Sequence, residues 1–173
     1  GEVRPKTGRI NHALSAQVEA SSSEEGFGWS LGFVNNGIRN SLHPSIIGWS
    51  SEFTTDRSNR EWIQFDLKEE KFIDSIRLYA VDLSPSYFNI QMGLSFPADF
   101  EILVSNNKFN WTNIVSERGY PQPVRNTHTF DLNERIKARY VRIDGNRLRA
   151  DPFDNNRYKM QFAEVEIIEY HKD

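Results

Sequence analysis

Gly28-Trp-Ser-Leu-Gly32 has the G-x-S-x-G spacing of a hydrolase nucleophile motif. This motif presents a reactive serine only where a buried strand runs into a tight turn and then into a helix. Here a polar, serine-rich stretch precedes the motif, and Phe33-Val-Asn-Asn-Gly37 follows it. Neither flank matches the required strand or helix, so we expect Ser30 to be a loop residue without a catalytic role.

The other residue types that do chemistry give no catalytic pattern. The chain has no cysteine, which excludes a thiolate metal site and a cysteine nucleophile. Its histidines are dispersed without the i, i+4 spacing of a zinc helix; they are His12, His43, His128 and His171. Carboxylates are abundant, but a glycosidase pair is defined by its separation in space. We therefore predict that the protein is not an enzyme.

Asn36-Gly-Ile-Arg-Asn-Ser41 is a candidate calcium-binding segment. Side-chain oxygens of Asn and Ser, together with loop carbonyls, are the hard ligands that Ca²⁺ prefers. Asn-Gly is equally the sequence of a tight turn, and this alternative stays open on local sequence.

The elements that must position these residues are strands. In Glu61-Trp-Ile-Gln-Phe-Asp-Leu67, Ile63, Phe65 and Leu67 share one face, and residues 138–144 repeat this alternation. Residues 72–81 alternate in the same way, with Phe72 expected on the face of Ile76 and Leu78. Further short strands are predicted at 17–20, 99–105, 111–115, 127–132 and 160–170. About eight antiparallel strands without a convincing helix indicate an all-β sandwich or jelly roll.

Length and charge limit the remaining possibilities. The 173 residues are the size of one domain, which we assign to 1–173 with a core from 16 to 170. The net charge of −3 disfavours nucleic acid as a partner, and no apolar run is long enough for membrane insertion. Residues 27–60 are rich in Gly, Asn, Ser and Trp, so we expect an ordered functional loop there.

Several segments, in order, resemble the coagulation factor V/VIII C-type (discoidin) domains and, more closely, bacterial family 32 carbohydrate-binding modules. They include Gly28-Trp-Ser30, Asn36-Gly37, Gly48-Trp-Ser-Ser51, Glu61-Trp-Ile-Gln-Phe-Asp-Leu67 and Gln161-Phe-Ala-Glu-Val165. The other matches are 18–23, 96–102, 105–111 and 138–143. The resemblance implies a galactose-binding-like jelly roll with a structural calcium ion and a ligand site in the loops at one end.

The resemblance also implies which residues hold these ligands. The calcium ligands would be Asn36 in the place of the family's Asp, Ser41, the carbonyl of Ala163 and the carboxylate of Glu164. Asn36 removes one negative charge from this set. For the sugar, an aromatic face and a few hydrogen-bonding groups are needed. The loops offer Arg57, Tyr87, Arg149, Phe153, Asn155 and Tyr158.

These observations predict a non-catalytic carbohydrate-binding module that targets a larger glycan-degrading or cell-surface protein to its glycan. The family resemblance implies a secreted bacterial protein that is extracellular, cell-surface or periplasmic, and a monomeric module. Two alternatives stay open: a lipid- or protein-adhesion domain, and a spacer without a ligand. In the lipid-binding version, Tyr87, Phe88, Ile90 and Met92 would supply exposed hydrophobic spikes.

Overall fold

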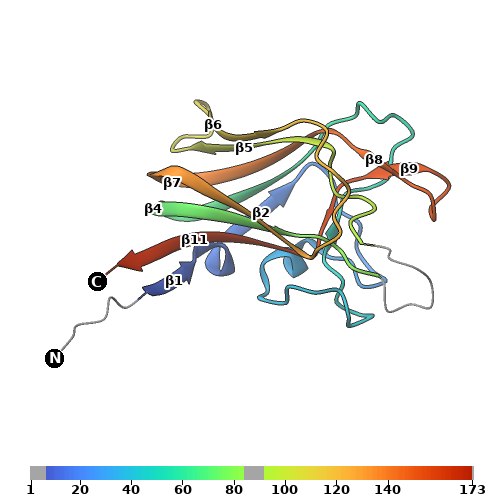
Figure 1. Ribbon diagram of the computed structural model, residues 1–173, viewed down its shortest axis with the longest axis horizontal. Coiled ribbons are helices and arrows are strands. Elements are labelled where there is room, and N and C mark those ends of the chain that lie inside the picture. Colours follow the sequence, from blue (N-terminus) through green and yellow to red (C-terminus); the bar gives the residue numbers. More distant parts are fainter. Residues whose placement is uncertain (1–6, 84–91, 173) are drawn as a thin grey trace.

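The computed structural model describes residues 7–83 and 92–172, and within these ranges the regular secondary structure is almost entirely β-strand (Figure 1). Two short 3₁₀ helices, η1 (His12–Ser15) and η2 (Leu31–Asn35), are the helical elements of this part. The strands are β1 (Thr7–Asn11), β2 (Gln17–Ala20), β3 (Trp49–Ser50), β4 (Glu61–Tyr79), β5 (Asp99–Ser105), β6 (Thr112–Glu117), β7 (Thr127–Arg147), β8 (Arg149–Asp151), β9 (Arg157–Lys159), β10 (Gln161–Phe162) and β11 (Glu164–Lys172). No helix in these ranges is long and apolar enough to cross a membrane.

The two longest strands form the spine of the fold. β4 and β7 pair antiparallel from Glu61 opposite Gly145 to Tyr79 opposite Thr127. The register shifts between Asp66 and Lys71, where the two-stranded ribbon folds over on itself. Each long strand therefore contributes one half to each layer of a sandwich. One layer adds β2, β5 and β6, and the other adds β11 and β1.

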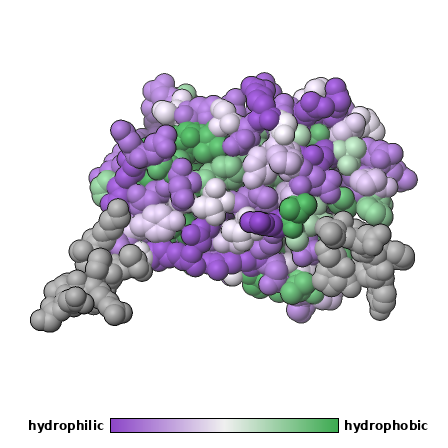
Figure 2. Space-filling view, in the orientation of Figure 1, coloured by the Kyte–Doolittle hydropathy of each residue, from purple (hydrophilic) through white to green (hydrophobic). Residues whose placement is uncertain are grey.

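Both layers bury their inner faces in one hydrophobic core. Ile63 and Phe65 come from the first half of β4, and Ile73, Ile76 and Leu78 from the second; all five are fully buried. Hydrophobic atoms also reach the surface over β5 and β6 (Figure 2). There the partly buried side chains include Ile114 and Val115, which pack against the core. The predicted all-β antiparallel sandwich is confirmed.

The alternation predicted for the second half of β4 is wrong at Phe72 and Ile73. Phe72 was expected to share a face with Ile76 and Leu78, which are fully buried, yet Phe72 is 41% exposed, while Ile73 is fully buried. A second register shift between Ile73 and Ser75 reverses the alternation at this point. The Phe72 ring instead lies beneath two cations, Arg135 and Lys137, at 5.1 and 5.3 Å from its centroid.

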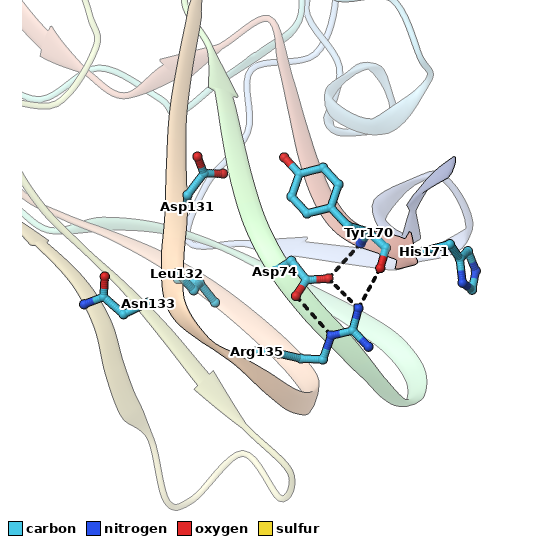
Figure 3. Close-up of a pocket in the computed structure, with 7 residues that line it drawn as sticks. All are labelled: Asp74, Asp131, Leu132, Asn133, Arg135, Tyr170 and His171. Carbon is cyan, nitrogen blue, oxygen red and sulfur yellow. Dashed lines mark hydrogen bonds and ion pairs between the residues drawn. The ribbon is translucent and has the colours of Figure 1, made fainter. Parts of the chain in front are cut away.

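A polar hollow lies near the C-terminal end of β11 (Figure 3). The Arg135 guanidinium donates two hydrogen bonds to the Asp74 carboxylate, at 3.0 and 2.9 Å, and a third to the Tyr170 carbonyl. Asp74 also accepts the Tyr170 N–H at 2.7 Å. These groups satisfy one another's hydrogen-bonding capacity and hold β11 to β4 beyond the last paired residue of the ladder. The hollow therefore has a structural role.

The long loop before β4 covers the outer face of the second layer. Trp29 and Ile47 pack there against Tyr79, Val81 and Ala163. This packing explains why the end of β4 is buried on both faces, and it agrees with the expectation of an ordered loop in this region.

Gly48 is required where this loop passes closest to the sheet. Its φ is +151°, and a Cβ at this position would lie 2.4 Å from the Phe162 carbonyl oxygen and 2.7 Å from the Ala163 Cα. Both neighbours are backbone atoms, so no side chain can move aside.

We predict that Gly48→Ala lowers the free energy of unfolding by about 2 kcal/mol or more, because it adds a backbone clash to a strained conformation. Urea unfolding followed by tryptophan fluorescence measures the change. Gly32→Ala is the matched control, since nothing lies within 4 Å of its Cβ position. That variant should stay within about 0.5 kcal/mol of the parent chain. Equal stability of the two variants would refute the close-packing account.

Candidate functional site

A surface pocket of about 390 Å³ lies at the loop end of the sandwich, beside the β8–β9 hairpin. Its lining side chains include two tyrosines and three arginines: Tyr120, Tyr158, Arg57, Arg147 and Arg149. They come from the loop before β4, the loop before β7, the end of β7 and the hairpin. We call this the loop-end pocket.

Backbone hydrogen bonds bring these distant segments together. The Leu148 N–H donates to the Arg57 carbonyl at 3.2 Å, which joins the loop before β4 to the end of β7. Thr54 and Tyr158 exchange two N–H···O bonds of 2.9 Å, which join the same loop to β9. The position of the Arg57 backbone is therefore fixed by its own carbonyl and by the nearby Thr54–Tyr158 pair. The Arg57 side chain is exposed.

Arg149 is the fixed cation of the pocket. Its guanidinium donates to the Phe96 carbonyl at 3.0 Å and to the Tyr120 carbonyl. Burial lowers the pKa of Arg149, and the neighbouring charge of Arg147 adds to this effect. Two neutral carbonyls orient the group but leave its charge uncompensated.

Tyr120 is held rigidly by aromatic packing and by a histidine. Its ring stacks on Phe96 at a centroid distance of 5.5 Å. The His128 Nε2 lies 2.8 Å from the Arg125 carbonyl, which can only accept, so Nε2 carries the proton. His128 Nδ1 then accepts the Tyr120 hydroxyl proton at 2.6 Å. Burial lowers the pKa of His128, which favours this neutral form.

The structure brings together Arg57, Arg149 and Tyr158 among the sugar-binding residues predicted from sequence. Phe153 and Asn155 lie instead at the tip of the β8–β9 hairpin; Phe153 is 67% exposed, and Asn155 has a φ of +53°. Tyr87 lies outside the described residues, as do Phe88 and Ile90 of the proposed hydrophobic spikes. The fourth spike residue, Met92, packs partly buried against the core.

Tyr120 and Arg147 line the pocket but were missed in the sequence. Two signals could have pointed to them: an aromatic residue in the turn-rich segment Gly119-Tyr-Pro121, and the repeated cation in Arg147-Leu-Arg149.

A second hollow surrounds the G-x-S-x-G segment, with Phe27, Trp29 and Phe33 in its lining. Phe27 is 99% exposed. Ser30 stands at the N-terminus of the five-residue helix η2, without the strand–turn–helix geometry of a nucleophile elbow. A hydrogen bond from the Ser30 side chain lowers the pKa of the Glu25 carboxyl. The partner of Ser30 is therefore a carboxylate.

Two of the residues predicted to bind calcium are in contact, but through the Asn36 N–H, since the Asn36 side-chain oxygen accepts the Ile38 N–H at 3.0 Å. Glu164 is fully buried, and its carboxylate accepts the Asn36 N–H at 3.3 Å and the Gly37 N–H at 2.6 Å. Ala163 adjoins it, while the buried Ser41 hydroxyl donates to the Ile47 carbonyl at 2.9 Å. Burial raises the pKa of Glu164 to about 8, against the opposing effect of the two N–H donors. Two residues along, the Glu166 carboxylate is neutralised by Arg39 at 2.8 Å.

Comparison with known proteins places this geometry in a family. The family model for the F5/8 type C domain matches residues 17–161. No curated protein matches the chain by sequence.

Solved structures share the fold at low sequence identity. A family 32 carbohydrate-binding module of NanJ from C. perfringens, in complex with galactose, is 14% identical with a TM-score of 0.68; the match covers 93% of this chain and 99% of that one. Chitosan-binding module 1 of a Paenibacillus sp. IK-5 chitosanase/glucanase is 20% identical with a TM-score of 0.64, over 91% and 98% of the two chains. The chain therefore belongs to the F5/8 type C (discoidin) domain family.

Proposed function

We propose that the chain is a non-catalytic carbohydrate-binding module that holds a glycan in the loop-end pocket. The observation that carries the proposal is the lining itself: Tyr158 and Tyr120 offer aromatic surface, and Arg57 and Arg149 offer hydrogen-bond donors. A pyranose needs this combination, an apolar face for its C–H groups and donors for its hydroxyls. The exposed hairpin tip with Phe153 and Asn155 extends the same end of the molecule.

The ligands of relatives with solved structures support the proposal of a glycan-binding module. Their ligands include galactose, GalNAc-β-1,3-galactose and chitotriose. As one module of a larger secreted or surface protein, the domain would keep its neighbours at a glycan by raising their effective concentration there. Modest affinity of the isolated module would suffice.

We predict that Arg57→Ala weakens glycan binding about tenfold or more, because a charged donor to the sugar is lost. The Arg57 side chain is exposed, so the fold should survive. Tyr158→Leu, which keeps apolar packing but removes the ring, should weaken binding similarly. Isothermal titration with glycans first identified on an array provides the measurement.

Phe109→Ala is the control for this test, since Phe109 is 87% exposed on the turn between β5 and β6. Its affinity should equal that of the parent chain. Unchanged affinity in both pocket variants would show that the glycan does not bind in this pocket. Loss of binding in Phe27→Ala alone would move the site to the hollow around Phe27.

We further propose that calcium binds beside Glu164. Oxygen donors are present: a fully buried carboxylate lies against the Asn36-Gly37 turn, and the Ala163 carbonyl and Ser41 are in adjoining segments. Calcium binding would require the Glu164 oxygens to exchange the Asn36 and Gly37 N–H groups for the ion. Calcium there would give the Glu164 carboxylate a cationic partner. The Glu166 carboxylate already has one in Arg39. Its role would be structural, tying the loop before β4 to β11.

We predict that metal-free protein loses stability as the pH rises from about 4.5 to about 8. The folded pKa of Glu164 lies above its unfolded value, so its contribution is complete below pH 4.5 and is lost as pH rises through 8. The loss should be on the order of 4 kcal/mol. Urea unfolding in EDTA across this pH range measures it.

Calcium should restore stability at pH 8, and Glu164→Gln should abolish both the pH dependence and the calcium effect. Glu169→Gln, a carboxylate on β11 that pairs with His12, is the control and should keep the calcium effect. Identical unfolding curves with calcium and with EDTA at pH 8 would argue against the metal.

A further inference from the structure

The loop-end pocket gathers positive charge in a chain whose net charge is −3. Three guanidinium groups line it, those of Arg57, Arg147 and Arg149. None of the described residues that line this pocket is acidic. The pocket therefore differs in sign from the protein as a whole.

These three arginines lack the carboxylate partners that most arginines have in the described part of the chain. Arg149 bonds to two carbonyl groups, which carry no net charge. The side chains of Arg57 and Arg147 are exposed and form no hydrogen bond or ion pair with any residue of 7–83 or 92–172. By contrast, most other arginines in those ranges face a carboxylate: Arg39, Arg77, Arg118, Arg135, Arg139, Arg142 and Arg157.

The acids that lie close along the chain are already engaged. Asp99 accepts the Gly119 N–H at 2.8 Å and lies 3.8 Å from Arg118. Asp151 caps the Phe153 N–H at 2.9 Å. Asp154 holds Lys159 at 2.6 Å and Arg157 at 2.7 Å. Asp99 and Asp154 therefore already face other cations, whereas Asp151 and Asp56, the residue before Arg57, bond to neutral N–H and hydroxyl groups. None of these four acids lines the pocket.

The mutual repulsion of the arginines leads to the same conclusion. The positive charge of Arg147 adds to the effect of burial in lowering the pKa of Arg149. An anion bound between these side chains would relieve that repulsion. A guanidinium meets a carboxylate or sulfate with two parallel N–H···O bonds, which are among the strongest hydrogen bonds in proteins.

We infer that the loop-end pocket selects acidic saccharides, with a carboxylate or sulfate group held by Arg57 and Arg147 and the sugar ring against Tyr158. The inference rests on the proposed function and adds the charge of the ligand. A neutral sugar would leave the two exposed guanidinium groups without a charged partner. An amino sugar would place a like charge beside them.

The test is titration calorimetry with matched trisaccharides at about 50 and about 500 mM NaCl. The panel contains α-1,4-linked trigalacturonate, the neutral galactotriose of the same linkage, its sulfated derivative and a glucosamine trimer. We expect the two acidic members to bind about tenfold more tightly than the neutral one at low salt, with the glucosamine trimer weakest. The acidic advantage should shrink several-fold at high salt, since the arginines are exposed.

Arg147→Gln provides the residue-level test. The ratio of acidic to neutral affinity should fall about fivefold, because one charged donor is lost at an exposed position. Arg9→Gln removes the same charge from β1 at the other end of the molecule, and the ratio should be unchanged (Figure 1). A ratio that falls equally in both variants would assign the effect to net charge and overturn the inference.

Two results separate this inference from the proposed function. Equal or tighter binding of neutral sugars, on the panel or on a glycan array, would overturn the acidic preference and leave the glycan-binding proposal intact. Binding to phosphatidylserine vesicles with silence across all sugars would overturn both.

Discussion

The hydrogen bonds between the Glu164 carboxylate and the backbone of Asn36 and Gly37 are the contact on which the loop architecture depends. A fully buried carboxylate is tolerated only when its oxygens are satisfied or its charge is removed. Glu164 therefore requires the loop before β4 to stay against β11, whether the carboxylate is protonated or bound to a cation. Gly48 permits the approach, since any side chain there would meet the backbone of Phe162.

The folded-over ribbon of β4 and β7 determines where the other loops gather. Because β4 and β7 pair antiparallel, with Glu61 opposite Gly145, the start of β4 and the end of β7 lie side by side, and the loops that precede and follow them converge. Main-chain bonds between Arg57 and Leu148 and between Thr54 and Tyr158 then fix the lining of the pocket. The sandwich supplies rigidity, and the pocket chemistry lies in loops that carry little of the core.

The sequence was sufficient for the parts of the fold that local alternation governs. Ile63, Phe65, Val141 and Ile143 are buried as their period-two pattern predicted. Phe72 was misplaced because a register shift is decided by the partner strand and leaves no local mark. The short strands β8 and β9 contain Arg149 and Tyr158, which were expected in loops, because the pairing of these strands depends on the surrounding segments. The family resemblance indicated the loop end, but the weak local signals of Tyr120 and Arg147 could not show that these two residues line one pocket.

The central claim is that an anionic group of a saccharide completes the charge balance of the loop-end pocket. A crystal structure of the chain soaked with trigalacturonate tests this most directly. We predict a pyranose ring against Tyr158, with a carboxylate at about 2.7–2.9 Å from the guanidinium of Arg57 or Arg147. A saccharide bound at the hollow around Phe27, or in the loop-end pocket with its carboxylates turned to solvent, would contradict the account.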